Sequence, residues 1–249
     1  MKKILVFTLF MMMSFNSSFS QEVFYLHAVK VSDSDLENFE KIQKEYVTEL
    51  AQDAKKNGII KDWVLLKPIN NVGEATEQEY NYVWVHIFQS VEQMTSRTDW
   101  WMNSKEKFGI DPAVLYKGEI LKSGYYYWKT EKQIEASRDG QYIIMNWATP
   151  KDLGKALSMA DELSEGFRKN MKKEGMAEWG VASKILPQGE GQSTIFFWDV
   201  YNSLNGAFKH MMNQAILSDM DPTKFGEFVE NMPNGWDGRG IFEFVTFTN

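Results

Sequence analysis

The sequence predicts an α+β fold in which two βαββαβ units of one chain pack sheet to sheet as a barrel. Blocks of sequence recur in the same order after about 110 residues, as in an internal duplication. Each copy reads as strand, helix, strand, strand, helix, strand. The chain also holds 9 Trp, 10 Tyr and 17 Phe, most of them in the predicted strands. Aromatic strands build either a large core or a cavity lined by ring faces.

The duplication is visible in pairs of short matches. The segment FYLHAVKVSDSDL at 24–36 corresponds to QYIIMNWATPKDL at 141–153, and WVHIFQS at 84–90 corresponds to FWDVYNS at 197–203. The last strand of each copy, GYYYWKT and GIFEFVT, follows in the same order. We therefore expect one unit at 22–130, a charged linker at 131–138 and a second unit at 139–249.

Apolar residues at helical spacing predict the helices of each unit. The first helices are expected from Leu36 to Ala54 and from Leu153 to Met171, and each is followed by a glycine that suits a helix stop. The second helices are expected at Val91 to Lys107 and at Leu204 to Met220.

A single βαββαβ unit forms a four-stranded antiparallel sheet with both helices on one face. The other face would expose aromatic rings to water, so two copies are expected to bury these faces against each other. Alternation along the third strand separates its two sets of side chains. We expect Val83, Val85 and Ile87 to face the helices, and Trp84 and His86 to face the space between the sheets.

The element order and the tandem copies resemble the dimeric α+β barrel superfamily of ferredoxin-like units. Its members include antibiotic-biosynthesis-type monooxygenases, NIPSNAP-like and EthD-like proteins and, in elaborated form, chlorite dismutases and dye-decolourising peroxidases. The resemblance covers nearly all of residues 22–249. It implies the fold, but members differ in activity, so the fold does not select a function.

The first 20 residues have the pattern of a secretory signal. Lys2 and Lys3 precede an apolar run at 4–13 and a small, mostly polar stretch at 14–20. An uncleaved N-terminal anchor is the alternative. The run is too short to span a bilayer, and no later segment is long and apolar enough to do so. We expect an exported protein that is soluble after cleavage, as a monomer or a homodimer.

Composition removes several classes of function. The absence of cysteine excludes disulfides, thiolate metal sites and a cysteine nucleophile. A formal net charge of −7 without a basic run argues against nucleic acid as a partner. The three histidines are scattered, so no dedicated metal site is expected.

His86 and Asp199 occupy equivalent positions in the two copies. Alternation predicts that both point into the barrel from opposite sheets, where a histidine near a carboxylate could act as a general base. The alternative is a polar pair on a solvated cavity wall.

Further candidates share the strand phase expected to face that space. They combine rings with a few polar groups, which suits a planar small molecule. Ordinary core and rim packing is the alternative. The predicted ligand-binding residues are His27, Trp84, Tyr125, Tyr127, Asn146 and Glu243.

His210 lies in the second helix of the second copy. The haem-binding relatives take an axial histidine from their C-terminal copy, so the resemblance implies His210 as a haem ligand, with Arg239 as a distal cation. A surface histidine on a helix is the alternative, and apart from haem no cofactor is expected.

Four functions remain open at this point. The first is binding of a small, largely apolar or aromatic molecule inside the barrel. The second is a cofactor-independent oxygenase with His86 or His27 as base, the third is a haem protein, and the fourth is an interaction module without a small ligand. The sequence does not decide whether the protein is an enzyme.

Overall fold

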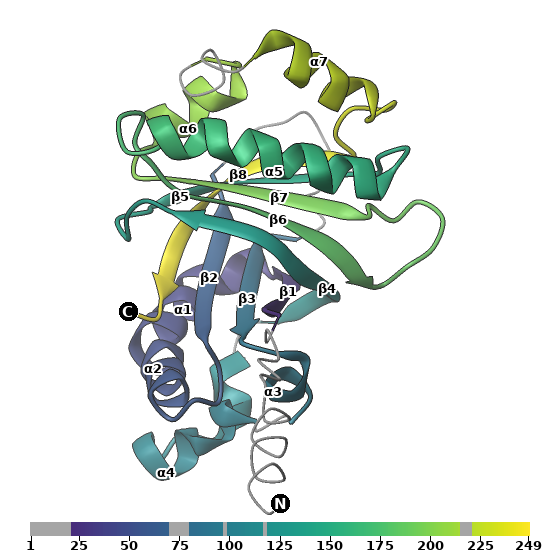
Figure 1. The fold of residues 1–249 in the computed structure, drawn as a ribbon. Coiled ribbons are helices and arrows are strands. Elements are labelled where there is room, and N and C mark those ends of the chain that lie inside the picture. The colour runs from purple at the N-terminus through teal and green to yellow at the C-terminus, as the bar shows by residue number, and fades with distance from the viewer. Residues whose placement is uncertain (1–20, 70–79, 97–98, 117–118, 215–220) are drawn as a thin grey trace, which may run out of the picture.

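The computed structural model describes residues 21–69, 80–96, 99–116, 119–214 and 221–249. The predicted signal peptide, 1–20, lies outside this range. Eight antiparallel strands form a closed barrel with the order β1-β3-β2-β8-β5-β7-β6-β4 (Figure 1). The strands are β1 (Val23–Val31), β2 (Asp62–Pro68), β3 (Tyr82–Phe88), β4 (Ile120–Glu135), β5 (Tyr142–Ala148), β6 (Met176–Leu186), β7 (Ile195–Tyr201) and β8 (Gly238–Phe247).

The strand order repeats between the halves. The first four strands lie as β4-β1-β3-β2 and the last four as β8-β5-β7-β6, and the pairs β2–β8 and β4–β6 close the barrel. The predicted α+β barrel of two βαββαβ units is therefore confirmed. The bounds of the units, 22–130 and 139–249, stay a prediction.

The predicted linker at 131–138 is shorter in the structure, because β4 continues to Glu135. Within this stretch Ile134 pairs with Trp179 of β6 and is buried. One apolar residue among charged neighbours gave no strand signal, but barrel closure pairs the whole extension with β6.

Helices cover the outside of the barrel on two opposite sides (Figure 1). In the first half the chain from Leu36 to Lys56 is one helical stretch that contains a π-helical turn, η2. The helices of this half are η1 (Asp33–Asp35), α1 (Leu36–Ile42), η2 (Gln43–Val47), α2 (Thr48–Lys56), α3 (Val91–Thr95), η3 (Trp100–Asn103), α4 (Ser104–Phe108) and η4 (Pro112–Tyr116). The second half has α5 (Leu153–Asn170), α6 (Leu204–Met211) and α7 (Pro222–Glu230).

The second helix of each unit is broken where the sequence predicts one continuous helix. In the first unit α3 ends at Thr95, and the chain continues through η3 and α4. In the second unit α6 ends at Met211, and Asn213 adopts a positive φ of 55°. A left-handed residue at this point stops a helix.

The barrel interior is filled by side chains from both halves. Its core includes Phe24, Trp128, Phe196 and Trp198 together with aliphatic residues. The indole of Trp198 covers Gly180 so closely that a Cβ built there would lie 2.0 Å from the ring. The space between the sheets is therefore a packed core, where the sequence predicted a ligand cavity.

The predicted orientation of β3 is wrong. Val83, Val85 and Ile87 belong to the barrel interior, whereas Trp84 packs in the cluster under the first-half helices and His86 lies on the same face. Alternation separates two faces of a strand but does not say which neighbour each face meets. Here both faces are apolar, so hydrophobicity did not distinguish the interior from the helix side.

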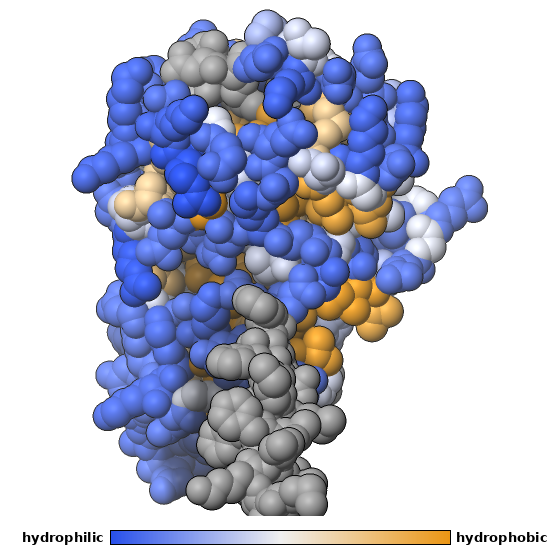
Figure 2. Space-filling model, viewed as in Figure 1, coloured by the Kyte–Doolittle hydropathy of each residue, from blue (hydrophilic) through white to orange (hydrophobic). Residues whose placement is uncertain are grey.

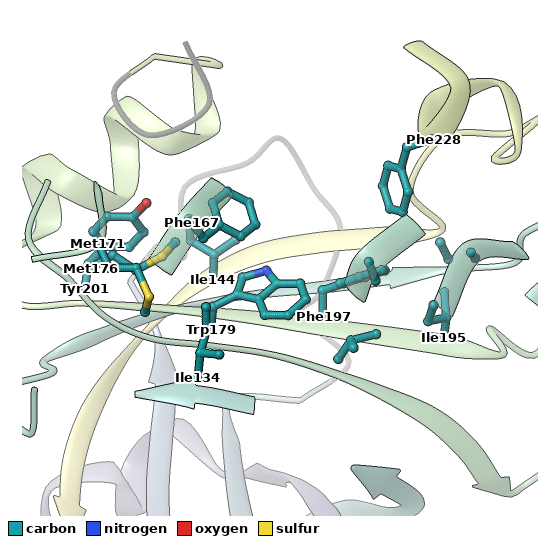
Figure 3. Close-up of a cluster of buried hydrophobic side chains, with 14 of the residues drawn as sticks. Ile134, Ile144, Phe167, Met171, Met176, Trp179, Ile195, Phe197, Tyr201 and Phe228 are labelled. Carbon is teal, nitrogen blue, oxygen red and sulfur yellow. The ribbon is translucent and has the colours of Figure 1, made fainter. Parts of the chain in front are cut away.

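A second cluster fills the space between the other sheet and its helices (Figure 3). Phe167 of α5 and Phe228 of α7 pack onto Trp179 of β6 and Phe197 of β7. This half is thus closed by aromatic packing.

Candidate functional site

A cavity of about 740 Å³ lies between the outer face of the first sheet and the helices that cover it. Strands β1, β3 and β4 supply one wall, and η2, α3 and η3 supply much of the other. Its aromatic lining comprises Tyr25, Trp63, Trp84, Phe88, Trp100, Trp101, Tyr125 and Tyr127. A volume and lining of this kind suit a small organic molecule.

His86 is the most buried ionisable group in this wall. Its side chain comes from β3, the residue is 6% exposed, and its ring stacks on Tyr25 with centroids 4.4 Å apart. Nδ1 is buried and has no hydrogen-bond partner among the described residues. Burial, with the nearby His27, lowers the pKa of His86 to about 3. The imidazole is therefore neutral at physiological pH, when it has one acceptor and one donor nitrogen.

His27 of β1 lies nearer the surface of the same wall. Its ring stacks on Tyr125 at 4.0 Å and tilts against Trp84 at 4.9 Å. Its Nε2 lies 2.9 Å from the Ser123 hydroxyl, and burial lowers its pKa to about 4. Two neutral imidazoles thus lie on one aromatic wall.

Gln43 connects the opposite walls, and the sequence reasoning missed it. The amide of Gln43 accepts a hydrogen bond from Trp84 Nε1 and donates one to the Leu115 carbonyl, each at 3.0 Å. It lies at the start of η2, and π-helical turns occur frequently at functional sites. No pattern in the sequence marks the π-helical turn, but a buried glutamine in an apolar helix stripe is a usable signal.

The cavity gathers five of the predicted site residues, namely His27, Trp84, His86, Tyr125 and Tyr127. The other four, Glu243, Asn146, Asp199 and His210, lie elsewhere. Glu243 of β8 forms an ion pair with Lys67 at 2.9 Å. Asn146 and Asp199 lie in a separate network on the second sheet.

The predicted pairing of His86 with Asp199 is wrong. Their strands, β3 and β7, are four positions apart in the ring of eight, and each side chain points outward from the barrel. The two positions are equivalent, as predicted, but equivalence places them on opposite outer faces because the helix-facing phase repeats in both halves.

The second half holds a polar network where the first half has its cavity. Asn146 donates to Asp199 at 2.8 Å, and Arg239 donates to Asn146 at 2.6 Å. His210 lies with Nδ1 2.9 Å from the Tyr201 hydroxyl and Nε2 3.7 Å from Asp199. Burial lowers the pKa of His210 and raises that of Tyr201. These side chains are thus engaged mainly with one another in the part of the chain that the structure describes.

These contacts do not fit the haem-ligand role implied for His210. A ligating imidazole needs one nitrogen directed at the iron. Both His210 nitrogens already face protein groups, and Arg239 is engaged with Asn146. No group of three metal-ligating side chains occurs in the described ranges either. None of the helices in those ranges has the length and apolar character needed to cross a bilayer.

Comparisons at the sequence level give no relative: no protein-family model matches the chain, and no curated protein matches it. Solved structures do match. A protein from Lactobacillus acidophilus provisionally assigned as a monooxygenase has a TM-score of 0.56 at 11% identity, covering 92% of this chain and 97% of its own. A similarly assigned protein from Fusobacterium nucleatum has a TM-score of 0.56 at 10% identity, covering 93% and 95%.

An anthrone oxidase-like protein also matches, with a TM-score of 0.54 at 9% identity over 92% of each chain. Identities this low carry information on the fold alone. Together with the closed barrel and its repeated strand order, they agree with the resemblance drawn from the sequence. The chain has a closed α+β barrel fold, formed by two ferredoxin-like units of one polypeptide, and shares this fold with these solved structures.

Proposed function

We propose that this protein binds a small aromatic molecule in the cavity between the first sheet and its helices. The observation that carries the proposal is a buried imidazole, His86, on an aromatic wall beside 740 Å³ of space. Buried polar groups are normally hydrogen-bonded, so a buried nitrogen without a partner points to a missing group.

The contrast between the halves supports this location. Aromatic packing fills the equivalent region of the second half (Figure 3), and Asn146 and Asp199 of the same sheet are buried and bonded to each other. The first half has kept its space, although filling it with side chains would stabilise the fold by about 25 cal/mol per Å² of buried apolar surface. An open cavity that costs stability is expected where it serves a ligand.

Binding is tested by calorimetric titration of the protein with 2-naphthol. Met94→Trp should place a larger side chain from α3 into the cavity. Because the ligand would then be overpacked against the indole, binding should weaken at least about tenfold. Phe208→Trp, on the exposed surface of α6, is the matched control and should bind like the parent. Equal affinity in all three proteins would place binding outside the cavity and contradict the proposal.

A cofactor-independent oxygenase is the second candidate, because His27 and His86 are neutral bases at physiological pH. Either could remove a proton from an electron-rich ring methylene. Dioxygen would then oxidise that carbon to a carbonyl, placing one oxygen atom in the product and the other in water. Oxygen uptake with anthrone should occur in the parent protein and be lost in His86→Leu and His27→Leu. If the parent protein takes up no oxygen, the oxygenase function is contradicted and only the binding function stands.

The N-terminal pattern also supports export, with cleavage after Ser20. N-terminal sequencing of the protein expressed with its full leader should find Gln21 first. A mature chain that begins at Met1 would contradict export by cleavage.

A further inference from the structure

We infer that the cavity selects an uncharged ligand with one hydrogen-bonding group, and that this group pairs with the imidazole of His86. The inference rests on the proposed binding function and adds a ligand class to it. It excludes two neighbouring classes, which are carboxylates or phosphates of similar shape and plain hydrocarbons.

The charges on the cavity wall support the inference that the ligand is uncharged. The described lining contains neither lysine nor arginine, and its one formally charged residue is Asp99, an exposed residue next to η3. Protein sites for carboxylates and phosphates ordinarily supply Arg, Lys or clustered backbone N–H groups. Among the described residues of the wall, an anion would find no cationic partner to replace its hydration, and Asp99 would repel it.

The two imidazoles do not replace a cation. Both are uncharged at physiological pH because burial disfavours their protonated forms. Each ring already stacks on a tyrosine, His86 on Tyr25 and His27 on Tyr125. A neutral imidazole can donate a hydrogen bond to, or accept one from, a neutral group of the ligand, but it cannot neutralise a negative charge.

The buried polar groups of the wall support the inference that one hydrogen-bonding group of the ligand pairs with His86. Trp84 Nε1 and both functions of the Gln43 amide are engaged with each other or with Leu115, so these groups are already satisfied. His27 Nε2 has Ser123 as its partner. The imidazole of His86 lines the cavity and makes no hydrogen bond in the described part of the chain. A single polar group at the His86 end, with rings elsewhere, matches this distribution.

The mouth of the cavity fits an apolar body entering from outside. Tyr125 of β4 and Leu186 of β6 line the cavity and are 48% and 54% exposed. Figure 2 shows apolar residues gathered on the surface near the end of β6. A ligand that crosses this rim keeps its rings against apolar side chains along the way.

The test compares three probes of one shape: naphthalene, 2-naphthol and 2-naphthoate, titrated into the mature protein at about neutral pH. We expect 2-naphthol to bind about tenfold more tightly than either of the others, as one buried hydrogen bond provides. If 2-naphthoate binds as tightly as 2-naphthol, the inference on charge is overturned. If naphthalene does, the inference on His86 is overturned. If none of the three binds, the proposed function itself fails.

Variants assign the preference to named residues. His86→Leu should reduce 2-naphthol affinity to that of naphthalene while leaving naphthalene affinity unchanged. His86→Gln, which keeps hydrogen-bonding groups, should retain part of the preference and serves if the leucine variant does not fold. Asp99→Asn should raise 2-naphthoate affinity about twofold to threefold, as expected for an exposed charge. Glu227→Gln, on α7, is the matched control and should change none of the affinities.

Discussion

The imidazole of His86 lies almost parallel to the ring of Tyr25, with centroids 4.4 Å apart and planes inclined by 17°. The two residues face each other across the β1–β3 ladder, where they form a direct pair. The phenol ring therefore fixes the plane of the imidazole. Its edge nitrogens are held in one orientation relative to the cavity.

This stack predicts a graded effect of substitutions at Tyr25. Tyr25→Leu should weaken 2-naphthol binding about fivefold to tenfold, because the ligand loses an aromatic contact of about 0.5–1.5 kcal/mol on the cavity wall and His86 loses the ring that positions it. Tyr25→Phe keeps the ring and should bind within about twofold of the parent. Calorimetric titration measures both affinities. Equal losses in the two variants would indicate that the hydroxyl, rather than the stack, is required.

Burial of His86 predicts that the protein loses stability on acidification. Its folded pKa, about 3, lies below the value of about 6.5 expected in the unfolded chain. Between these values the unfolded chain binds the extra proton, so stability is complete above about pH 6.5 and falls as the pH drops towards 3.

Removing His86 should flatten this dependence. The slope for one such group is at most about 1.4 kcal/mol per pH unit. Urea unfolding of the parent and of His86→Phe between about pH 4 and pH 6 measures the difference, since the remaining groups are common to both. Parallel stability curves would show that His86 is protonated in the folded protein.

The fold could be predicted from the sequence because the information was redundant. Repeated matches, helical periodicity and aromatic strands all indicated two βαββαβ units, and the repeated strand order confirms them. Details that depend on a single residue were lost. Asn213 has a positive φ and lies inside the helix predicted from Leu204 to Met220. Nothing in the sequence marked this asparagine as the point where the helix stops.

Five of the predicted site residues lie together in the structure, but not where the sequence placed them. His27, Trp84, His86, Tyr125 and Tyr127 share one face, as alternation requires. Alternation could not say whether that face meets the helices or the other sheet, because both faces of β3 are apolar. That ambiguity also produced the wrong pairing of His86 with Asp199.

Close packing in the barrel interior predicts that Gly180 cannot be enlarged. A Cβ there would lie 2.0 Å from Cζ2 of Trp198, and the indole is held by its hydrogen bond to Glu178. Gly180→Ala should therefore destabilise the protein by about 3 kcal/mol, the upper range of overpacking. Gly166→Ala, on the exposed face of α5 with nothing within 4 Å, should stabilise it by about 0.5–1 kcal/mol. Urea midpoints measure both, and unchanged stability in Gly180→Ala would contradict the packing.

The contacts of His210 predict that it does not ligate haem. Titration of the protein with haemin should give absorption spectra that are the same for the parent and for His210→Ala. The physical reason is that ligation would require His210 to leave Tyr201 and Asp199 in a buried site. A Soret band present in the parent and lost in His210→Ala would refute this.

The polar network of the second half predicts a residue that stabilises the fold without affecting the cavity. Asp199 is 3% exposed, accepts a hydrogen bond from Asn146 and lies 3.7 Å from His210 Nε2. Asp199→Ala removes the acceptor of Asn146 Nδ2 and the carboxylate beside His210 Nε2, and should lower the free energy of unfolding by about 2–4 kcal/mol. Asp199→Asn keeps an acceptor for Asn146 and should cost less.

The same variants should leave 2-naphthol affinity unchanged, because β7 lies across the barrel from β3. Measuring unfolding and binding on one set of proteins separates the two halves. Asp199→Ala should change only the free energy of unfolding, whereas His86→Leu should weaken the binding of 2-naphthol. If Asp199→Ala weakened binding while the protein remained folded, the halves would be coupled through the barrel core, and the cavity could not be treated as a property of the first unit.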